Sequence, residues 1–281
     1  MTRAAAKRRR FIRSTPGHII LALLALTALL PFVLVLINSG KTRAEVAANP
    51  LALPSVFRWE NYVQAWQYGH FAQGFVNSIL LTGLTVLIVL AVAAPAAYVI
   101  AAKKIRTWPI AMVYFMIAMT VPIQLFLFPL YSVFAQLHFL GNILPVSFVL
   151  AAVNLPLAIL LLRTFFLQVP QELGEAASMD GANTVQVLRH VIVPVVSPGL
   201  VTVGIIAGLA AWNEFLITRT FLQGQGNFTA LLGFLSMNGQ FDSDQGVMMA
   251  AATILILPVL VFFLIAQRYF VDGLVSGSVK G

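Results

Sequence analysis

The chain has 281 residues, of which 60% are hydrophobic and only 9% are charged, whereas a soluble domain carries about 25% charged residues. Apolar runs of 18 or more residues recur, which is typical of an integral membrane protein with several helices. The chain has no cysteine, which excludes disulfides, thiol catalysis and thiolate metal sites. The net charge of +8 lies mostly beside the apolar runs. It therefore favours membrane topology over nucleic-acid binding.

The N-terminal segment, residues 1–16, holds six basic residues between Arg3 and Arg13. The apolar run that follows, about residues 17–37, is longer than the 7 to 15 apolar residues of a cleaved signal peptide. We therefore expect a retained transmembrane helix, with the arginine cluster as its cytoplasmic anchor.

Six apolar segments have the length and composition of membrane-spanning helices. They cover about residues 17–37, 74–102, 108–134, 143–162, 199–217 and 248–267. Several contain prolines, which membrane helices tolerate as kinks. Gly204 and Gly208 in the fifth span have the GxxxG spacing that permits close helix approach. The predicted fold class is an all-α membrane protein with six transmembrane helices.

The distribution of basic residues predicts the topology. Of the 17 lysines and arginines, 13 lie in residues 1–16, 103–107, 163–198 and 268–281, and four lie in the three loops on the other side. Lysine and arginine are enriched in cytoplasmic loops. We therefore expect a multi-pass protein of the bacterial inner membrane, with both termini and the 163–198 loop in the cytoplasm.

The loop at residues 38–73 contains four tryptophan and tyrosine residues. Such rings often lie at the lipid headgroup level, and a surface for a partner protein is the alternative. Gly40-Lys41-Thr42 resembles the end of a phosphate-binding loop. That motif needs a further glycine where Val35 stands, so we reject it.

Spans one to four and six contain no aspartate, glutamate or lysine in their interiors. Ion-coupled transporters usually keep such residues for coupling. Glu214, beside Trp212 and Asn213, is predicted to lie at membrane depth in the fifth span, as a solute or gating residue or as a hydrogen-bonded group between helices. The four histidines are scattered along the chain, at His18, His70, His138 and His190. We therefore predict no catalytic residue, metal site or cofactor.

The stretch from Glu172 to Pro198 is a polar interruption in the apolar second half of the chain. Pro170 suits the first turn of a helix, and Glu172 and Glu175 lie near the positive end of its dipole. Gly181 can end this helix, because glycine tolerates the left-handed conformation.

A second short helix is predicted to follow. Asn183 can cap it, with Gln186 as capping-box partner, while Val185, Leu188 and Ile192 recur at helical spacing and predict one apolar face. Pro194 and Pro198 mark the turn into the fifth span. Small residues leave a surface that another protein can approach closely: Ala176, Ala177, Ser178, Gly181 and Ala182. The loop has two basic and three acidic residues, which favours a protein partner over anionic lipid.

Glu175-Ala-Ala-Ser-Met-Asp-Gly181-Ala, followed by Val191-Ile-Val-Pro194, resembles the "EAA" loop of permease subunits of binding-protein-dependent ABC importers. Val191 and Val193 replace the usual Ile and Leu. Three further stretches resemble the carbohydrate-uptake branch, in the maltose-type second-permease group. They are residues 57–62 with Asn77-Ser78, Trp212 to Phe215, and the tail from Gln267 to Gly281. In the tail, Asp272 replaces a residue that is often basic or polar in the family.

The resemblance implies the fold of a type I ABC importer permease, in which the 163–198 loop is a coupling helix that docks on an ATPase. It assigns five residues to ATPase docking: Glu175, Ala176, Ala177, Asp180 and Gly181. It implies a second homologous permease, two ATP-binding subunits and an extracytoplasmic solute-binding protein as partners, with membrane lipid around the spans. The solute path would lie near Asn154, Trp212, Asn213 and Glu214. A secondary transporter or channel without ATPase, a membrane-embedded enzyme and a membrane scaffold are the alternatives.

Overall fold

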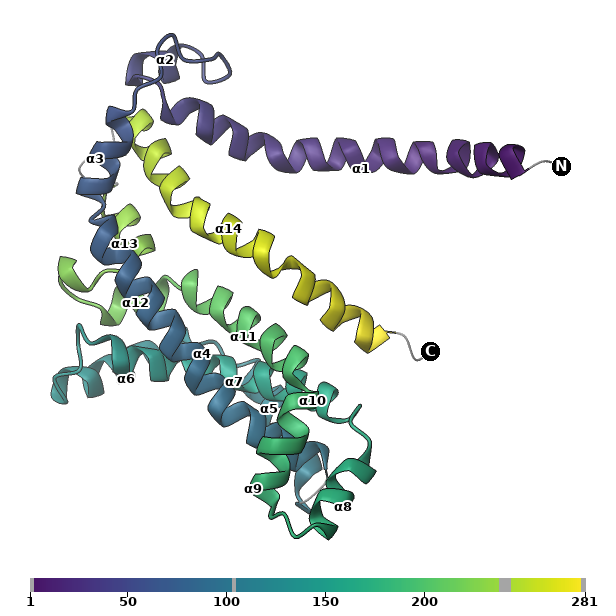
Figure 1. Ribbon diagram of the computed structural model, residues 1–281. Coiled ribbons are helices and arrows are strands. Elements are labelled where there is room, and N and C mark those ends of the chain that lie inside the picture. Colours follow the sequence, from purple (N-terminus) through teal and green to yellow (C-terminus); the bar gives the residue numbers. More distant parts are fainter. Residues whose placement is uncertain (1–2, 103–104, 238–243, 279–281) are drawn as a thin grey trace. The chain divides into compact units, whose positions relative to one another are not determined.

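The computed structural model describes residues 3–102, 105–237 and 244–278, and the side chains of 17–102, 105–237 and 244–267. Within these ranges the elements are helices, with no strand (Figure 1). Lys103 and Lys104 of the predicted basic turn, Asp242, and the side chains of the N-terminal arginine cluster and of Asp272 lie outside the described part. The chain divides into two compact units, residues 1–69 with 236–257, and residues 70–235 with 258–281.

The first unit contains α1 (Arg3–Ser39), α2 (Arg43–Ala48), α3 (Glu60–Tyr68) and the beginning of α14 (Gln245–Ser278). The apolar window of α1 is not buried by any other described part of the chain. This helix therefore presents its side chains to lipid or to a partner.

A buried lysine organises the loop that follows α1. Lys41 is 1% exposed. Its Nζ donates to Asn38 Oδ1 (3.0 Å) and to two loop carbonyls. The amide of Asn61 donates to the carbonyls of Ser39 (2.7 Å) and Lys41 (2.9 Å). At Gly246 a Cβ atom would lie 2.3 Å from the Lys41 carbonyl oxygen, so only glycine fits there. The structure therefore gives Lys41 a structural role.

A capping box begins α2 in the same loop. The backbone N–H of Glu45 donates to Thr42 Oγ1, and Thr42 N donates to Glu45 Oε2 (2.9 Å). The backbone and hydroxyl of Ser55 donate to Glu45 Oε1. The Ser55 hydroxyl, followed by the backbone N–H groups of Thr42 and Ser55, lowers the pKa of Glu45 to about 2.

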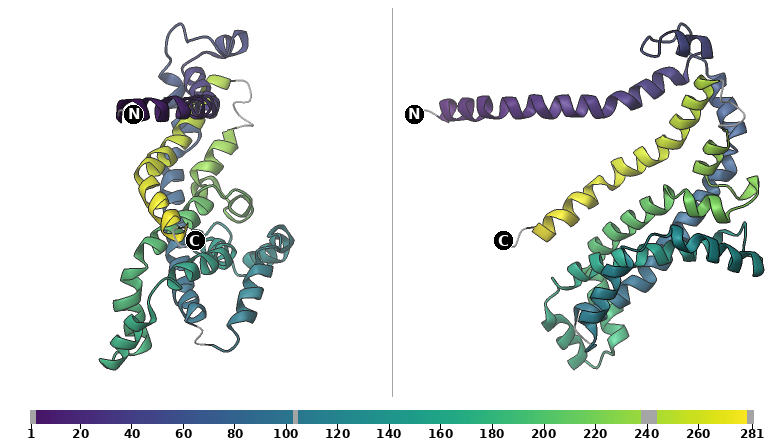
Figure 2. Two further views of the ribbon diagram at one scale, coloured as in Figure 1. Left: turned by 90° about the vertical axis from the view of Figure 1, so that its right-hand side faces the viewer. Right: turned by 180° about the vertical axis from the view of Figure 1, so that it is seen from behind.

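The second unit is built around three apolar helices, α4 (Phe71–Ala101), α7 (Ile143–Phe166) and α11 (Ser197–Trp212). They run side by side in Figures 1 and 2 and pack against one another. The core between them is rich in alanine, at positions 93, 97, 151, 158 and 207. Small side chains let helix backbones approach closely in membranes, where van der Waals contact drives association.

Two short helices follow α4, and three short elements follow α11. They are α5 (Trp108–Ala118) and α6 (Gln124–Gln136), and then α12 (Leu216–Phe221), η2 (Gln225–Asn227) and α13 (Ala230–Ser236). Asn77, near the start of α4, donates to the carbonyls of Gly226 and Phe228, both at 2.9 Å. Ser78 Oγ accepts from Ala230 N at 3.0 Å. These bonds fix the loop after α12 to α4.

Four described helices are long and apolar enough to cross a membrane, at Gly17–Ser39, Phe71–Ala101, Ile143–Phe166 and Gln245–Gln267. They match four predicted spans. The prediction of one helix over 108–134 differs from the structure, where Pro122 lies in the break between α5 and α6. These helices of 11 and 13 residues reach about 16 and 20 Å, short of the hydrocarbon core of about 30 Å.

The fifth predicted span and the predicted loops also differ in detail. The helix α11 ends at Trp212, so Glu214 lies beyond it and not within a span that continues to residue 217. The predicted loops at 38–73 and 218–247 contain short helices. Pro95, Pro156 and Pro258 stay inside continuous helices, as predicted.

Candidate coupling loop and translocation site

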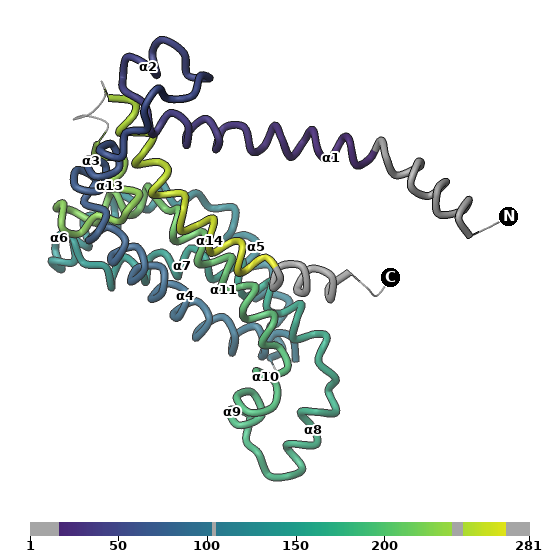
Figure 3. The backbone as a smooth tube through the Cα atoms, turned by 45° about the horizontal axis from the view of Figure 1, so that its top comes forward, coloured from purple at the N-terminus to yellow at the C-terminus, as the bar shows by residue number. Residues whose placement is uncertain are grey.

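The 163–198 loop forms two short helical arms that lie beyond the end of α4 (Figure 3). The first arm is α8 (Gln171–Met179). The second runs through α9 (Thr184–Gln186), a π-helix η1 (Val187–Ile192) and α10 (Val193–Val195). The second arm meets α11 at 81°. The predicted pair of short helices is therefore present.

The local signals predicted for the two arms are confirmed. Gly181 has a φ of +86°, the left-handed conformation that separates the arms. Gln186 N donates to Asn183 Oδ1 (3.0 Å), and Asn183 N donates to Gln186 Oε1 (2.8 Å). This reciprocal pair is the predicted capping box.

The predicted apolar face of the second arm is confirmed for two of its three residues, since Ile192 is buried and Leu188 is partly buried against the same core. Val185 is 71% exposed, whereas Val187 and Ile192 are buried in the core of the second unit. The two buried residues are five positions apart, the hydrogen-bond spacing of a π-helix, and not the three or four of an α-helix. The π-helical turn therefore selects which side chains face the bundle.

Four of the five residues predicted to dock on the ATPase are exposed, namely Glu175, Ala176, Asp180 and Gly181. Ala177 is half-buried and packs against the core of the second unit. Ala177 thus faces the bundle while the other four remain accessible.

Two exposed apolar residues of the loop were missed from the sequence. Met179 is 89% exposed and Val185 is 71% exposed, on either side of Gly181. Met179 lies inside the EAA motif, and its position in this otherwise small and polar stretch was the one sequence signal of its exposure. The exposure of Val185 was not predicted, because the residue was assigned to the buried apolar face.

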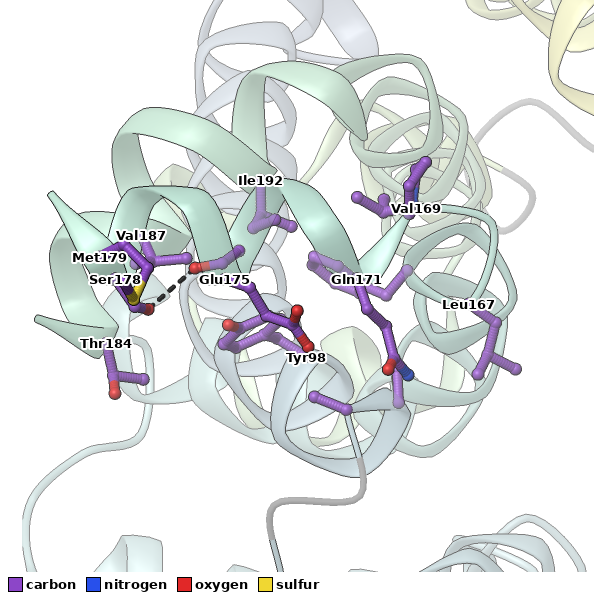
Figure 4. Close-up of a pocket in the computed structure, with 15 residues that line it drawn as sticks. Tyr98, Leu167, Val169, Gln171, Glu175, Ser178, Met179, Thr184, Val187 and Ile192 are labelled. Atoms are coloured by element: carbon purple, nitrogen blue, oxygen red, sulfur yellow. Dashed lines mark hydrogen bonds between the residues drawn. The ribbon is translucent and has the colours of Figure 1, made fainter. Parts of the chain in front are cut away.

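A cavity of about 650 Å³ lies between α8 and the ends of α4 and α7 (Figure 4). Tyr98 and Phe166 line it from the bundle, and Gln171 and Glu175 line it from α8. The hydroxyl of Ser178 donates to a backbone carbonyl within α8. Part of the inner face of α8 therefore borders open space, while Ala177 rests on the bundle.

The predicted path residues come from two helix ends and one helix interior. Asn154, in α7, donates to Leu150 O (2.8 Å). Trp212 ends α11 and stacks with Phe75, with 6.3 Å between ring centroids. No hydrogen bond within the described part of the chain joins Asn154 to Trp212, Asn213 or Glu214.

Asn213 and Glu214 bond to backbone groups near them. Asn213 is exposed and donates to Leu209 O (2.9 Å). Glu214 accepts from Ile217 N (2.8 Å) and Thr218 N (2.9 Å), so it caps the start of α12. Glu214 was considered as a solute or gating residue or as a hydrogen-bonded group between helices. Its carboxylate is hydrogen-bonded, but to the segment that follows it in the chain and not between two spans.

Among the described residues, no three histidine, aspartate or glutamate side chains lie together so that they could hold a metal ion.

The chain is similar to known permeases along most of its length. Residues 93–275 match the family model described as "Binding-protein-dependent transport system inner membrane component". A probable ABC transporter permease of Bacillus subtilis is 31% identical, over 98% of this chain and 91% of its own. A trehalose transport system permease of Mycobacterium tuberculosis is 33% identical, over 90% and 93%. A probable permease for starch degradation products of Thermoanaerobacterium thermosulfurigenes is 29% identical, over 92% and 93%.

A solved structure supports the fold. A chain in the crystal structure of a bacterial ABC transporter involved in import of the acidic polysaccharide alginate matches with a TM-score of 0.78 and 22% identity, over 96% of this chain and 99% of the other. The family match covers the coupling loop and the helices around it, and the relatives extend over nearly the whole sequence. The chain therefore belongs to the family of inner membrane components of binding-protein-dependent transport systems, the permeases of ABC importers.

Proposed function

We propose that this chain is the permease subunit of an ATP-driven importer of sugars or oligosaccharides. The exposed pair of helical arms around Gly181 is the observation that carries the proposal, because a permease without an ATPase needs no such surface. The solute class is supported by relatives named for trehalose and for starch degradation products.

The proposed assembly contains a second homologous permease, two ATP-binding subunits and an extracytoplasmic solute-binding protein. ATP hydrolysis takes place on the separate subunits, and this chain is not an enzyme. The topology has both termini in the cytoplasm of a bacterial inner membrane. Two of its six crossings are supplied by α11 and by α5 together with α6.

Coupling begins at the exposed residues Glu175 and Ala176 in α8 and Asp180 and Gly181 directly after it, with Ala177 behind them. Closure of the ATPase dimer pushes this surface toward the bundle. The helix α8 packs against η1, and the side chain of Val187 in η1 is buried in the core with that of Ile192. Movement of α8 is therefore transmitted through the second arm to α4 and α7, which open toward the outside.

The path for the solute is proposed to lie between this chain and the second permease, near Asn154, Trp212, Asn213 and Glu214. The stacked pair of Phe75 and Trp212 supports a carbohydrate solute, because aromatic faces offer a flat apolar surface to sugar rings. Asn213, which is exposed, is the amide best placed to meet a hydroxyl group.

Charge reversal on α8 tests the coupling proposal. Glu175→Lys should abolish ATP-driven uptake and weaken ATPase association about thirtyfold or more, since the loss of a paired interface charge costs about 2 kcal/mol or more. Glu172→Lys, an exposed change one turn earlier, is the matched control and should retain most uptake. Uptake and ATPase co-purification are measured in membranes with equal amounts of inserted protein. Normal uptake by Glu175→Lys would contradict the assignment.

A bulky residue at Gly181 provides a second test. No other atom lies within 4 Å of a Cβ built at this position, so the space is open, but the φ of +86° disfavours other residues. Gly181→Val should therefore alter the angle between the arms and abolish uptake while membrane insertion is unchanged.

A further inference from the structure

Arg163, in the last turn of α7, has no hydrogen-bonding partner for its guanidinium within the described residues. Its Nε atom is buried and unbonded. Its guanidinium carbon lies 5.5 Å from the centroid of the Trp108 ring, at the start of α5. A guanidinium carries five N–H donors and no acceptor. This group therefore needs a hydrogen-bond acceptor that the described residues do not supply.

A second arginine lies near the same helix start. Arg106 is exposed two residues before Trp108 and makes no hydrogen bond or ion pair with the described part of the chain. Tryptophan is enriched at the boundary between the hydrocarbon and the headgroups, and arginine near a helix end extends its charged head to the same level. The end of α7 and the start of α5 thus bring two positive charges and one indole to one end of the helix bundle.

The surface next to these residues is apolar and exposed along one face of α5. Ile110, Val113 and Ile117 are 69%, 54% and 58% exposed, and they recur at helical spacing below Trp108. A free phosphate ion makes no apolar contacts with such a surface, whereas the acyl chains of a phospholipid would cover it.

We propose that Arg163, Arg106 and Trp108 form a binding site for the phosphate of an anionic phospholipid such as phosphatidylglycerol. Arg163 donates to the phosphate oxygens, Trp108 holds the guanidinium plane, and the acyl chains lie along Ile110 and Val113. The proposal needs the membrane placement of α5 and α7 but not a particular solute or ATPase.

The test uses the full-length chain in nanodiscs of phosphatidylcholine that contain a titrated fraction of phosphatidylglycerol. Bound phosphatidylglycerol is counted by native mass spectrometry after release into detergent. Arg163→Gln should weaken retention about fivefold, the effect of about 1 kcal/mol per arginine at an anionic surface. Trp108→Leu should weaken it by a similar factor, and Arg163→Lys should restore it in part, because the charge remains while the planar fork is lost.

Arg219→Gln is the matched control. Arg219 also lies over an aromatic ring, with 5.9 Å to the Phe228 centroid, but its side chain is exposed on α12. This variant should retain wild-type lipid binding. If Arg163→Gln does not insert, Trp108→Leu and Arg163→Lys carry the test.

Three outcomes would overturn the proposal. Equal retention by the wild type and Arg163→Gln would show that the arginine binds no lipid. Displacement of phosphatidylglycerol by inorganic phosphate would show a soluble anion site. Unchanged lipid retention together with loss of ATPase or second-permease co-purification would assign Arg163 to a protein interface. Failure of the coupling proposal alone would leave the lipid result unaffected.

Discussion

Glu45 joins the two sides of a loop through hydrogen bonds to its carboxylate. Its carboxylate accepts hydrogen bonds from Thr42 and Ser55, and its pKa falls from 4.5 to about 2. Because the folded pKa is the lower one, these bonds stabilise the loop above pH about 4.5, and the stabilisation is lost as the pH falls toward 2. The protection factor of the Ser55 amide, which is its exchange rate relative to the intrinsic rate at the same pH, should therefore be larger at pH 6 than at pH 3.

The control for this prediction is Glu45→Gln, which has no carboxylate to titrate. Its Ser55 amide should show no added protection between pH 3 and pH 6, once the intrinsic pH dependence of exchange is removed. Identical profiles for the wild type and this variant would contradict the prediction.

Single residues were predictable from the sequence where their partners are near in the chain. The capping box of Asn183 and Gln186 and the left-handed Gly181 follow from spacings of three residues or fewer. Lys41 was not predictable as a buried residue, because its burial depends on the loop carbonyls and on Gly246 about 200 residues later. A lysine in a polar loop gives no sign of such surroundings.

At the level of helices, Gly199 is the position where α11 approaches the end of α7 so closely that glycine is required. A Cβ at this position of α11 would lie 2.4 Å from Phe165 at the end of α7. At Gly204 the nearest atom to a Cβ is 3.4 Å away, an ordinary contact with Leu90 of α4. The GxxxG pair predicted from the sequence thus faces α4, but it does not need glycine.

Gly199→Ala should destabilise the bundle by about 1–3 kcal/mol, since overpacking forces neighbouring atoms to shift. Gly204→Ala is the matched control in the same helix and should change stability by less than about 1 kcal/mol. The thermal unfolding midpoint of the purified protein in detergent measures both. A larger loss for Gly204→Ala than for Gly199→Ala would contradict this packing.

The positions of helices were predictable from apolar length, but their breaks were not. Composition could not distinguish one long span from α5 and α6, because an uninterrupted apolar run hides the break at Pro122. Nor could periodicity reveal the π-helix at Val187–Ile192, since one extra residue per turn leaves no mark in composition. Packing against α4 and α7 decides this register.

At the level of the whole molecule, the family and fold were predictable and the crossing number stays a prediction. The EAA motif, the positive-inside pattern and the absence of acids in most spans indicated a permease of ABC importers, and the family match confirms this. Four helices have sufficient length. The other two crossings depend on α11 and on α5 with α6, which apolar length alone cannot establish.

The absence of cysteine permits a direct test of the proposed topology. Leu53→Cys and Met179→Cys each place one thiol at a highly exposed position, 77% and 89% exposed in the wild type. In right-side-out vesicles, an impermeant maleimide should label Leu53→Cys at once and Met179→Cys only after permeabilisation. The reverse pattern would invert the topology and place the coupling loop outside the cell.

The bonds of Asn77 and Ser78 impose an order on biosynthesis. Their partners in the segment from Gly226 to Ala230 follow 149 to 152 residues later. At about 5–20 residues per second, the ribosome needs about 7–30 s to supply them. During that interval the Asn77 N–H groups and the Ser78 hydroxyl lack these partners. The nascent permease therefore passes through a stage in which a chaperone or insertase could hold this end of α4.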